Sequence, residues 1–371
     1  MVARSPIPDE VTLRDFFEEV AAVAVKKGIS VLQEKVYGSC ADLEMILNAR
    51  SVAYEKQGLK LEVPPTFIEG APCIGGLLAG VQIIGVECHS EEARVETIRY
   101  RGAPVGHELR LPGCRKLFYT GVSGFDLGAD RNVTEQCGAM FDTAEAMLQD
   151  QGLSSKDIVR TWIYMARLLD WYGEFNRVRT SCFTRYGILN NDGRGVLPAS
   201  TGIQGKRIAG EEIFMDVLAI RSDDAERYQA TPMCNVRQNE AYDYGSSFSR
   251  GMAVAFDGKP ELWVSGTASI NDEGKTVHHG DEQNQVVETV LAIAALLEGQ
   301  GSRLRDICQA TAYCKSDCDY QAFERIVDYL DMKDIPFVPV LADVCRDELL
   351  FEIDSVAVKG LAQSRDDQLN L

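Results

Sequence analysis

The pattern of apolar and polar residues recurs three times along the chain. In each copy a strand ends in Tyr, a helix with apolar residues at helical spacing follows, and a closing strand carries an apolar run. The strands end at residues 35–37, 162–164 and 311–313, the helices span 43–57, 171–186 and 319–330, and the apolar runs are 81–86, 213–218 and 351–356. Superposition of the copies places Gly80, Phe214 and Glu352 at one position. Only the third copy keeps a carboxylate there, which suggests a single active site.

The second and third copies have the fuller pattern. The second reads as strands 94–101, 107–111 and 116–122, helix 134–151, strand 158–165 and helix 172–186, and the third as strands 251–256 and 261–269, helix 282–300 and strand 306–314. Closing strands follow in both, and this order predicts an α+β fold with helices on one face of a mixed sheet. The first copy starts with a helix at 11–29 and lacks the opening strands. Its sheet edge must therefore be covered by a neighbour or left exposed.

The composition is that of a folded protein. The 371 residues predict two or three compact units, and a hydrophobic content of 45% suffices for their cores. No run of 18 apolar residues predicts a transmembrane helix, and the acidic N-terminal region does not resemble a signal peptide. The eleven scattered cysteines fit reduced, buried thiols. We therefore expect a cytoplasmic protein without a membrane partner.

The net charge of −18 argues against a nucleic-acid partner, because such proteins neutralise phosphates with Lys and Arg and here acids outnumber bases 56 to 38. A small anionic substrate remains compatible, since a pocket can be locally positive inside an acidic shell. We expect neither a metal nor an organic cofactor. Cys314 and Cys318 lack a second pair, the four histidines lack metal-ligand spacing, and no nucleotide-binding Gly-rich loop is present.

Several stretches of the second and third copies resemble the same protein family. They are residues 160–164, 175–183, 248–250, 264–270, 279–289 and 345–352. Together they resemble the Rid family (YjgF, or endoribonuclease L-PSP-like), and they are most similar to its chorismatase branch, in which Rid-like modules are fused in one chain. The most specific match is the Cys345-Arg346 pair before a Leu-Leu-x-Glu strand. The likeness covers residues 94–358, and the first 90 residues resemble only the second half of a Rid module.

The resemblance implies tandem Rid-like modules of the chorismate-mutase-like α+β fold. We expect a truncated module at 1–90, a module without the catalytic Glu at 91–235, a module carrying it at 236–358, and a flexible tail at 359–371. Rid modules assemble as trimers with sites between subunits. Three fused modules could close such a ring within one chain, as a monomeric pseudo-trimer or as a unit of a homo-oligomer.

The resemblance also implies a reaction. Chorismatases release pyruvate from chorismate, and hydrolysis of its enol ether begins by protonating a methylene carbon. The acid must hold its proton near pH 7, and desolvation raises the pKa of a carboxyl group. Glu352 alternates along its strand with apolar Phe351 and Ile353 and is our candidate for the general acid. The alternative interpretation is a surface-facing Glu352 paired with Arg346 or another base.

Two carboxylates on a substrate call for cationic side chains. The candidates are Arg160, Arg179, Arg250, Arg346 and Lys315. Because they come from both the second and the third module, we expect the site in a cleft between these modules, although each could also be a solvated charge. Tyr164 and Tyr313 could donate hydrogen bonds to the substrate, but the recurrence of Tyr at position 37 favours a packing role.

Cys345, seven residues before Glu352, is a candidate for steering the product. The resemblance implies that a thiol here is associated with hydroxybenzoate formation, and that a small residue near the Ser-Gly-Thr stretch also contributes. We therefore include Ala268 and Ser269 among the substrate-binding candidates. The combination of Ala268 with Cys345 leaves the product open, and Cys345 could equally be a buried structural thiol.

Two other functions remain open from the sequence. A Rid-type imine deaminase would need an Arg before a Ser/Thr strand, but the corresponding residues are Phe337, Pro65 and Ala199. A non-catalytic, ligand-binding pseudo-trimer would fit the Gly80 and Phe214 replacements, whereas the retained Glu352 argues against complete loss of function.

Overall fold

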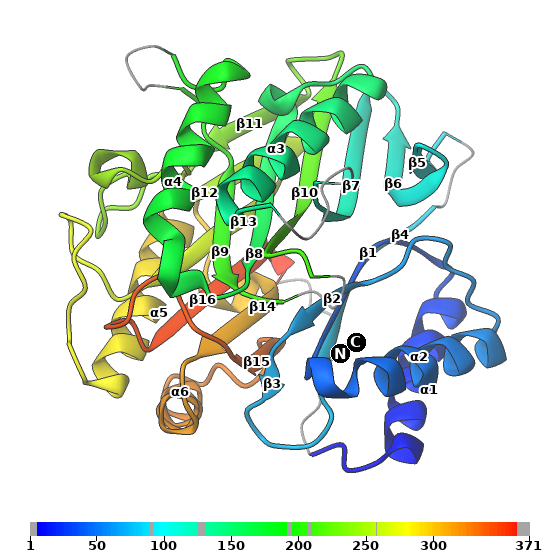
Figure 1. Cartoon of the computed structure of the whole chain (residues 1–371), viewed down its shortest axis with the longest axis horizontal. Helices are drawn as coiled ribbons and strands as arrows, with labels where there is room; N and C mark the ends of the chain where they lie inside the picture. Colours follow the sequence, from blue (N-terminus) through cyan, green and yellow to red (C-terminus); the bar gives the residue numbers. More distant parts are fainter. Residues whose placement is uncertain are drawn as a thin grey trace.

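The computed structural model describes residues 6–88, 92–124, 131–190, 195–206, 210–256 and 258–361. Its strands form three sheets of three, six and seven strands, and the helices cover their outer sides (Figure 1). Parallel and antiparallel pairings occur in each sheet, so the predicted α+β class with mixed sheets is confirmed. The predicted flexible tail at 359–371 lies outside the described residues from 362 onward.

The second module contains the complete predicted order of elements. These are β5 (Arg94–Tyr100), β6 (Ala103–Leu111), β7 (Cys114–Val122), α3 (Val133–Asp150), β8 (Ile158–Met165), α4 (Leu168–Arg185), β9 (Ala199–Gln204) and β10 (Ile213–Ser222). They form a sheet with the order β5-β6-β7-β10-β8-β9. The helix α3 begins at a capping box, in which Asn132 and Glu135 satisfy each other's backbone N–H groups.

The third module repeats this order. Its elements are β11 (Tyr228–Pro232), β12 (Gly251–Phe256), β13 (Lys259–Ala268), α5 (Glu282–Glu298), β14 (Ile307–Cys314), α6 (Asp317–Tyr329), β15 (Phe337–Leu341) and β16 (Phe351–Val358). The sheet order is β11-β12-β13-β16-β14-β15, followed by the short strand β3 of the first module. Corresponding elements of the two modules therefore occupy corresponding places.

The first module is incomplete, as the sequence predicts. It consists of α1 (Glu10–Lys26), β1 (Ile29–Gly38), α2 (Leu43–Gln57), β2 (Thr66–Glu69), β3 (Ala71–Pro72) and β4 (Leu78–Glu87). Its sheet has the order β2-β1-β4. The strand β4 corresponds to β10 and β16 of the other modules, but it is an edge strand, because no strand among the described residues takes the place of β7 or β13 beside it. The strand β3 is not part of this sheet. It joins the sheet of the third module, where Pro72 pairs with Val340 of β15.

The strand register confirms the predicted superposition of the three copies. Tyr37 pairs with Gly80, Tyr164 with Phe214 and Tyr313 with Glu352. Each of these strand pairs also has a register shift, and the shift lies next to the residue four positions before the Tyr. These residues are Gln33, Arg160 and Gln309. The three modules therefore share one geometry, and Glu352 is the carboxylate at the shared position.

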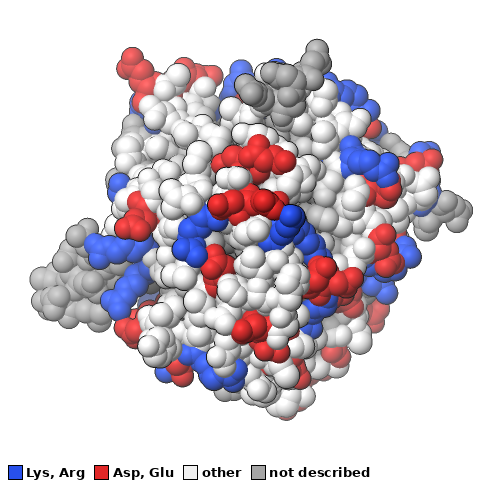
Figure 2. Space-filling model, turned by 90° about the vertical axis from the view of Figure 1, so that its left-hand side faces the viewer, with Lys and Arg blue, Asp and Glu red and all other residues white. Residues whose placement is uncertain are grey.

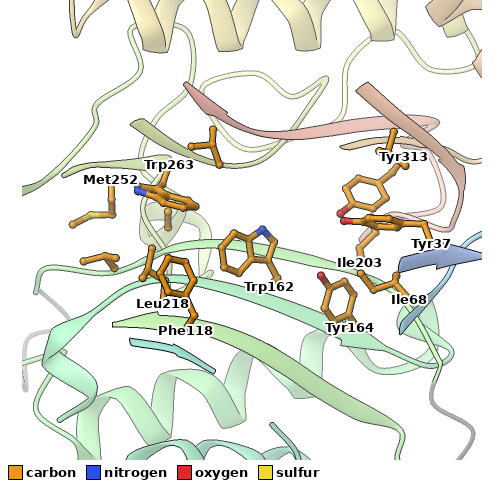
Figure 3. Close-up of a cluster of buried hydrophobic side chains, with 14 of the residues drawn as sticks. Tyr37, Ile68, Phe118, Trp162, Tyr164, Ile203, Leu218, Met252, Trp263 and Tyr313 are labelled. Atoms are coloured by element: carbon orange, nitrogen blue, oxygen red, sulfur yellow. The ribbon is translucent and has the colours of Figure 1, made fainter. Parts of the chain in front are cut away.

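The inner faces of the three sheets meet in one core. Tyr37, Tyr164 and Tyr313 approach one another there, and Trp162 packs edge-to-face on Trp263 with their ring centroids 5.9 Å apart (Figure 3). Alternate residues of the same strands point to the helices instead. Ile163 and Ile353, for example, belong to the helix-covered clusters of the second and third modules. The inward residues are therefore the ones that can form sites between modules.

The surface shows no basic stripe on the face drawn in Figure 2, where Lys and Arg alternate with Asp and Glu. Among the helices of the described ranges, none is long and apolar enough to cross a bilayer.

Candidate active site

Glu352 lies at the start of β16, on the inner face of the third sheet. Its side chain is 4% exposed, and its strand neighbours are Tyr313 on β14 and Ala268 on β13. The register of β13 shifts between Val264 and Thr267, which places Gly266 against the carboxyl group. A Cβ atom on Gly266 would overlap Oε1 of Glu352. The site therefore requires a glycine at this position.

The surroundings of Glu352 favour its protonated form. Burial is the main cause and the nearby Asp354 adds to it, raising the pKa of Glu352 from 4.5 to about 8, against the opposing charges of Arg160 and Arg346. The alternative interpretation of a surface-facing glutamate is wrong, because the side chain is buried. At neutral pH this carboxyl group can donate a proton.

Arg160 approaches Glu352 from the second module, but its direct partner is Asp354. Its Nη2 lies 3.1 Å from Oδ2 of Asp354 and 2.5 Å from the hydroxyl oxygen of Thr201 on β9, which itself donates to Asp354 over 2.9 Å. Arg160 is 1% exposed, and its Nε and Nη1 have no partner among the described residues. This clamp holds β8 and β9 of the second module against β16 of the third.

The first module reaches the same centre through Lys35. Its Nζ lies 3.5 Å from the ring centroid of Trp162, and its side chain is fully enclosed. Burial lowers the pKa of Lys35 to about 7, although Asp216 and Asp354 act in the opposite direction. All three modules therefore contribute charges to the core beside Glu352.

Three arginines of the candidate set surround this part of the interface. Arg250 donates from Nη2 to the hydroxyl group of Tyr244 over 2.7 Å and from Nε to the backbone oxygen of Asn239. The guanidinium group of Arg346 lies 6.0 Å from the ring centroid of Tyr244 and donates to the backbone oxygen of Gly274. Arg179 is the third. In the part of the chain that the structure describes, none of the three forms an ion pair with a carboxylate. They form a positive group inside an acidic protein.

Arg179 is the most buried of these three arginines, with 2% of its surface exposed. It lies on α4 between the rings of Phe175 and Phe248, 4.8 and 5.4 Å from their centroids. Its Nη2 donates to Oδ1 of Asn176 over 2.6 Å, while its Nε finds no acceptor among the described residues. Burial lowers the pKa of Arg179. A buried guanidinium without a carboxylate partner is prepared for an anionic ligand.

Cys345 and Tyr172 complete the group. Burial, reinforced by Glu352, raises the pKa of Cys345 to about 12, so its sulfur is a thiol at neutral pH. Tyr172 of α4 lies close enough to Cys345, Arg179 and Glu352 for their charges to influence its pKa, which burial raises. The thiol can therefore shape the pocket or accept a weak hydrogen bond, but its protonation disfavours a role as nucleophile.

A hollow of about 490 Å³ opens beside these side chains. Its walls come from α4 through Tyr172, Asn176 and Thr180, and from the third module through Tyr244 and Arg346. Tyr172 and Arg346 also act electrostatically on Glu352 or its neighbour Cys345. The volume suits a small molecule, and the walls belong to the second and the third module.

The remaining predicted site residues are Lys315, Ser269, Tyr164 and Tyr313. Lys315 donates to the backbone oxygen of Asp347 over 2.9 Å and lies near the carboxylates of Asp343 and Asp347, so its charge is already balanced. Ser269 is fully buried and donates to the backbone of Val277. Tyr164 and Tyr313 stand in the central core, and their hydroxyl groups have no hydrogen-bond partner among the described residues.

The residues that correspond to Glu352 in the other two modules cannot donate a proton. Phe214 replaces the carboxylate with a ring that stacks on Tyr164, with centroids 5.0 Å apart, and Gly80 has no side chain. The position at which an imine deaminase would have its arginine is occupied by Phe337, which cannot bind a carboxylate. Phe337 is buried among the helix-facing residues and packs edge-to-face on Phe323.

Tyr172, Asp354, Thr201 and Tyr244 are among the residues of the candidate site that were not predicted. Tyr172 precedes Arg179 by seven residues, which is two turns on one helix face, so the sequence does carry a signal for it. Asp354 follows Glu352 by two residues and shares its face of the strand. Thr201 and Tyr244 carry no comparable signal, because only the packing of one module on another brings them to the site.

Comparisons with known proteins identify relatives of this fold. A crystal structure of a chorismatase matches 88% of this chain and 93% of its own, with a TM-score of 0.60 and 17% sequence identity. RidA from the Antarctic bacterium Psychrobacter sp. matches 34% of this chain and 98% of its own, with a TM-score of 0.30 and 15% identity. The match to the chorismatase shows that this chain has the fold of that protein.

One curated sequence is also similar. The 3-hydroxybenzoate synthase of Streptomyces hygroscopicus is 28% identical over 252 residues, which is 61% of this chain and 70% of the relative. No family model matches the chain.

Proposed function

We propose that this protein is a chorismatase-like enzyme that releases pyruvate from chorismate or a related small cyclic carboxylic acid. The observation that carries the proposal is a buried carboxyl group, Glu352, whose pKa is raised to about 8 close to Arg346, which forms no ion pair with a carboxylate among the described residues. Cleavage of an anionic enol ether requires a protonated acid for the enol ether and cationic side chains for the carboxylates. The chorismatase fold and the similarity to a 3-hydroxybenzoate synthase support the same reaction.

Glu352 is the general acid of the proposed mechanism. Its proton moves to the methylene carbon of the enol ether, and the electron pair of the double bond forms the new C–H bond. The adjacent carbon becomes an oxocarbenium ion, and the Glu352 carboxylate that remains is stabilised by Arg160 and Arg346. Attack by water on this carbon, followed by collapse of the adduct, releases pyruvate and returns a proton to Glu352. An internal attack by the substrate's own hydroxyl group is the alternative that leads to an aromatic acid.

Arg179, Arg250 and Arg346 bind the substrate carboxylates in this proposal. Two of them contact Tyr244, which fixes their orientation before the substrate arrives. Tyr172 interacts electrostatically with both Arg179 and Glu352, and Cys345 with both Arg346 and Glu352. In this proposal the two side chains determine whether water reaches the oxocarbenium carbon, and therefore which product forms.

The direct test is pyruvate release from chorismate by the purified protein. We expect stoichiometric pyruvate, together with either a hydroxybenzoic acid or a dihydroxy-diene acid, which chromatography of the reaction mixture distinguishes. Imine substrates serve as the comparison, since the Rid-type deaminase is the runner-up. A folded protein that leaves chorismate intact but hydrolyses imines would overturn the proposal.

The pH dependence should report the protonation of Glu352. Because the acid must carry its proton, kcat/KM for pyruvate release is expected to be level below the pKa of Glu352, which is about 8, and to fall tenfold per pH unit above it. A buffer series from pH 6 to about 10 measures this limb. A rate that increases through this range would instead assign Glu352 to base catalysis.

Gly266→Ala is expected to displace the Glu352 carboxyl group, because the added Cβ overlaps Oε1. We expect pyruvate release to fall by at least about tenfold with the fold retained, since a small misplacement of a catalytic group is costly. Gly138→Ala on α3 is the matched control, as its Cβ meets nothing within 4 Å. Equal activity of the two variants would show that the carboxyl group does not need its present position.

A further inference from the structure

A second pocket, of about 460 Å³, lies at another end of the core. We call it the axial pocket, and its apolar wall includes Leu32, Ile84, Phe118, Trp263, Val338 and Val356. These residues come from all three modules, whose inner faces meet at this point. The pocket is distinct from the Glu352 site, since Val356 lies four residues beyond Glu352, about 13 Å along β16.

The axial pocket exists because the first module lacks a strand. In the third module Trp263 of β13 pairs with Val356, and in the second module Phe118 of β7 pairs with Leu218. Both pairs stand four residues beyond the position shared by Glu352, Phe214 and Gly80, so Ile84 is the equivalent residue of β4. No strand among the described residues pairs with the outer edge of β4. The place that an aromatic side chain fills in two modules is therefore empty in the first.

The polar groups around the pocket restrict the charge of a ligand. Lys116 of β7 and Glu261 of β13 occupy equivalent positions and form an ion pair, with Nζ and Oε1 2.5 Å apart. The amide of Gln82 donates to the backbone of Ala310 and accepts from Gln309, so it is satisfied within the protein. A charged ligand would disrupt this balance, and its desolvation would not be compensated.

Trp263, one of the wall residues, has a polar atom without a partner among the described residues. Trp263 is 3% exposed, and its indole Nε1 donates to no acceptor among the described residues. A buried N–H group is normally hydrogen-bonded, because leaving it unpaired costs free energy. An acceptor atom on a bound molecule would remove that cost.

We propose that the axial pocket binds a small, uncharged aromatic molecule that carries a hydrogen-bond acceptor. The aromatic ring replaces the side chain that the missing strand would supply between Ile84, Phe118 and Trp263. The acceptor pairs with Nε1 of Trp263, and the ion pair of Lys116 and Glu261 stays intact. The volume is that of a small-molecule site, and it is too small for the whole missing strand.

Ligand-observed NMR titration of the full chain with acetophenone tests the proposal. We expect one saturable site per chain, weaker binding of benzoate because of its charge, and weaker binding of ethylbenzene because it lacks the acceptor. Ile84→Phe, and Val86→Phe next to it on the half-buried end of β4, should abolish saturable binding by filling the pocket. Neither variant touches the Glu352 site, so pyruvate release should be unchanged.

Trp263→Phe separates the hydrogen bond from the packing. It should weaken acetophenone binding by about fivefold, the equivalent of one hydrogen bond, and leave ethylbenzene unaffected. Absence of saturable binding by the wild type would overturn the proposal. So would acetophenone binding that both filling variants leave intact, or benzoate binding more tightly than acetophenone.

Discussion

Glu352→Gln is expected to lower kcat for pyruvate release by about 10²- to 10⁴-fold, the range that a general acid supplies. Glutamine fills the same volume against Gly266 and keeps the strand register, but its amide cannot transfer a proton to carbon. Stopped assays of pyruvate at saturating chorismate measure the effect. Glu348→Gln is the control, since Glu348 is exposed and belongs to the same segment of the chain.

The same substitution should stabilise the protein. The unfolded chain releases the Glu352 proton above its ordinary pKa of 4.5, whereas the folded protein keeps it until about 8. The wild type therefore loses stability as the pH rises between these values, and the variant does not. We expect the variant to be more stable by roughly 4 kcal/mol at pH 8 and by almost nothing near pH 4.5.

Urea unfolding at both pH values provides the measurement. A variant that loses activity and stability together would show that Glu352 supports the fold rather than the reaction. A variant with nearly unchanged kcat would exclude Glu352 as the proton donor.

Arg179→Met is expected to lower kcat/KM by about 10²-fold, mainly through KM, because a charge-assisted contact to a substrate carboxylate contributes up to about 3 kcal/mol. Methionine preserves much of the packing between Phe175 and Phe248. The empty protein should not lose stability, since the substitution removes a buried charge that has no carboxylate partner among the described residues. Initial rates over a range of chorismate concentrations separate KM from kcat.

Arg185→Met on the same helix is the matched control. Arg185 is exposed and pairs with Asp142, so its loss should change neither kinetic constant. Arg179→Lys adds a second comparison, as it keeps the charge but not the planar fork. If Arg179→Met and Arg185→Met had the same KM, the substrate carboxylate would have to bind elsewhere.

Much of the fold could be predicted because the periodicity repeats. The second and third modules reproduce the predicted order of elements, and β8 and β12 begin and end at the predicted residues. The strand β11 was not predicted, since it is short, polar and ends in proline. The two-residue strand β3 carries no periodic signal, and only its pairing with β15, far along the chain, defines it.

Residues of the candidate site could be proposed from the sequence where one strand or one helix carries the information. Superposition of the repeats isolates Glu352, and Arg179 belongs to a recognisable helix. The orientation of Arg160 towards Asp354 depends on the packing of β8 and β9 against β16, which no local pattern encodes. The raised pKa of Glu352 arises in the same way, because burial between modules is a property of the assembled chain.

The pairing of β3 with β15 has a consequence for the synthesis of this protein. The strand that contains Pro72 has no partner until Val340, which is 268 residues later (340 − 72), has been synthesised. At about 5–20 residues per second, translation of this interval takes roughly 13–54 s. During part of that time the side of the first module that meets the third module, including Tyr37 beside Thr311, has no permanent cover. We expect the nascent chain to rely on holding chaperones in this interval, and the seam between β3 and β15 to close among the last events of folding.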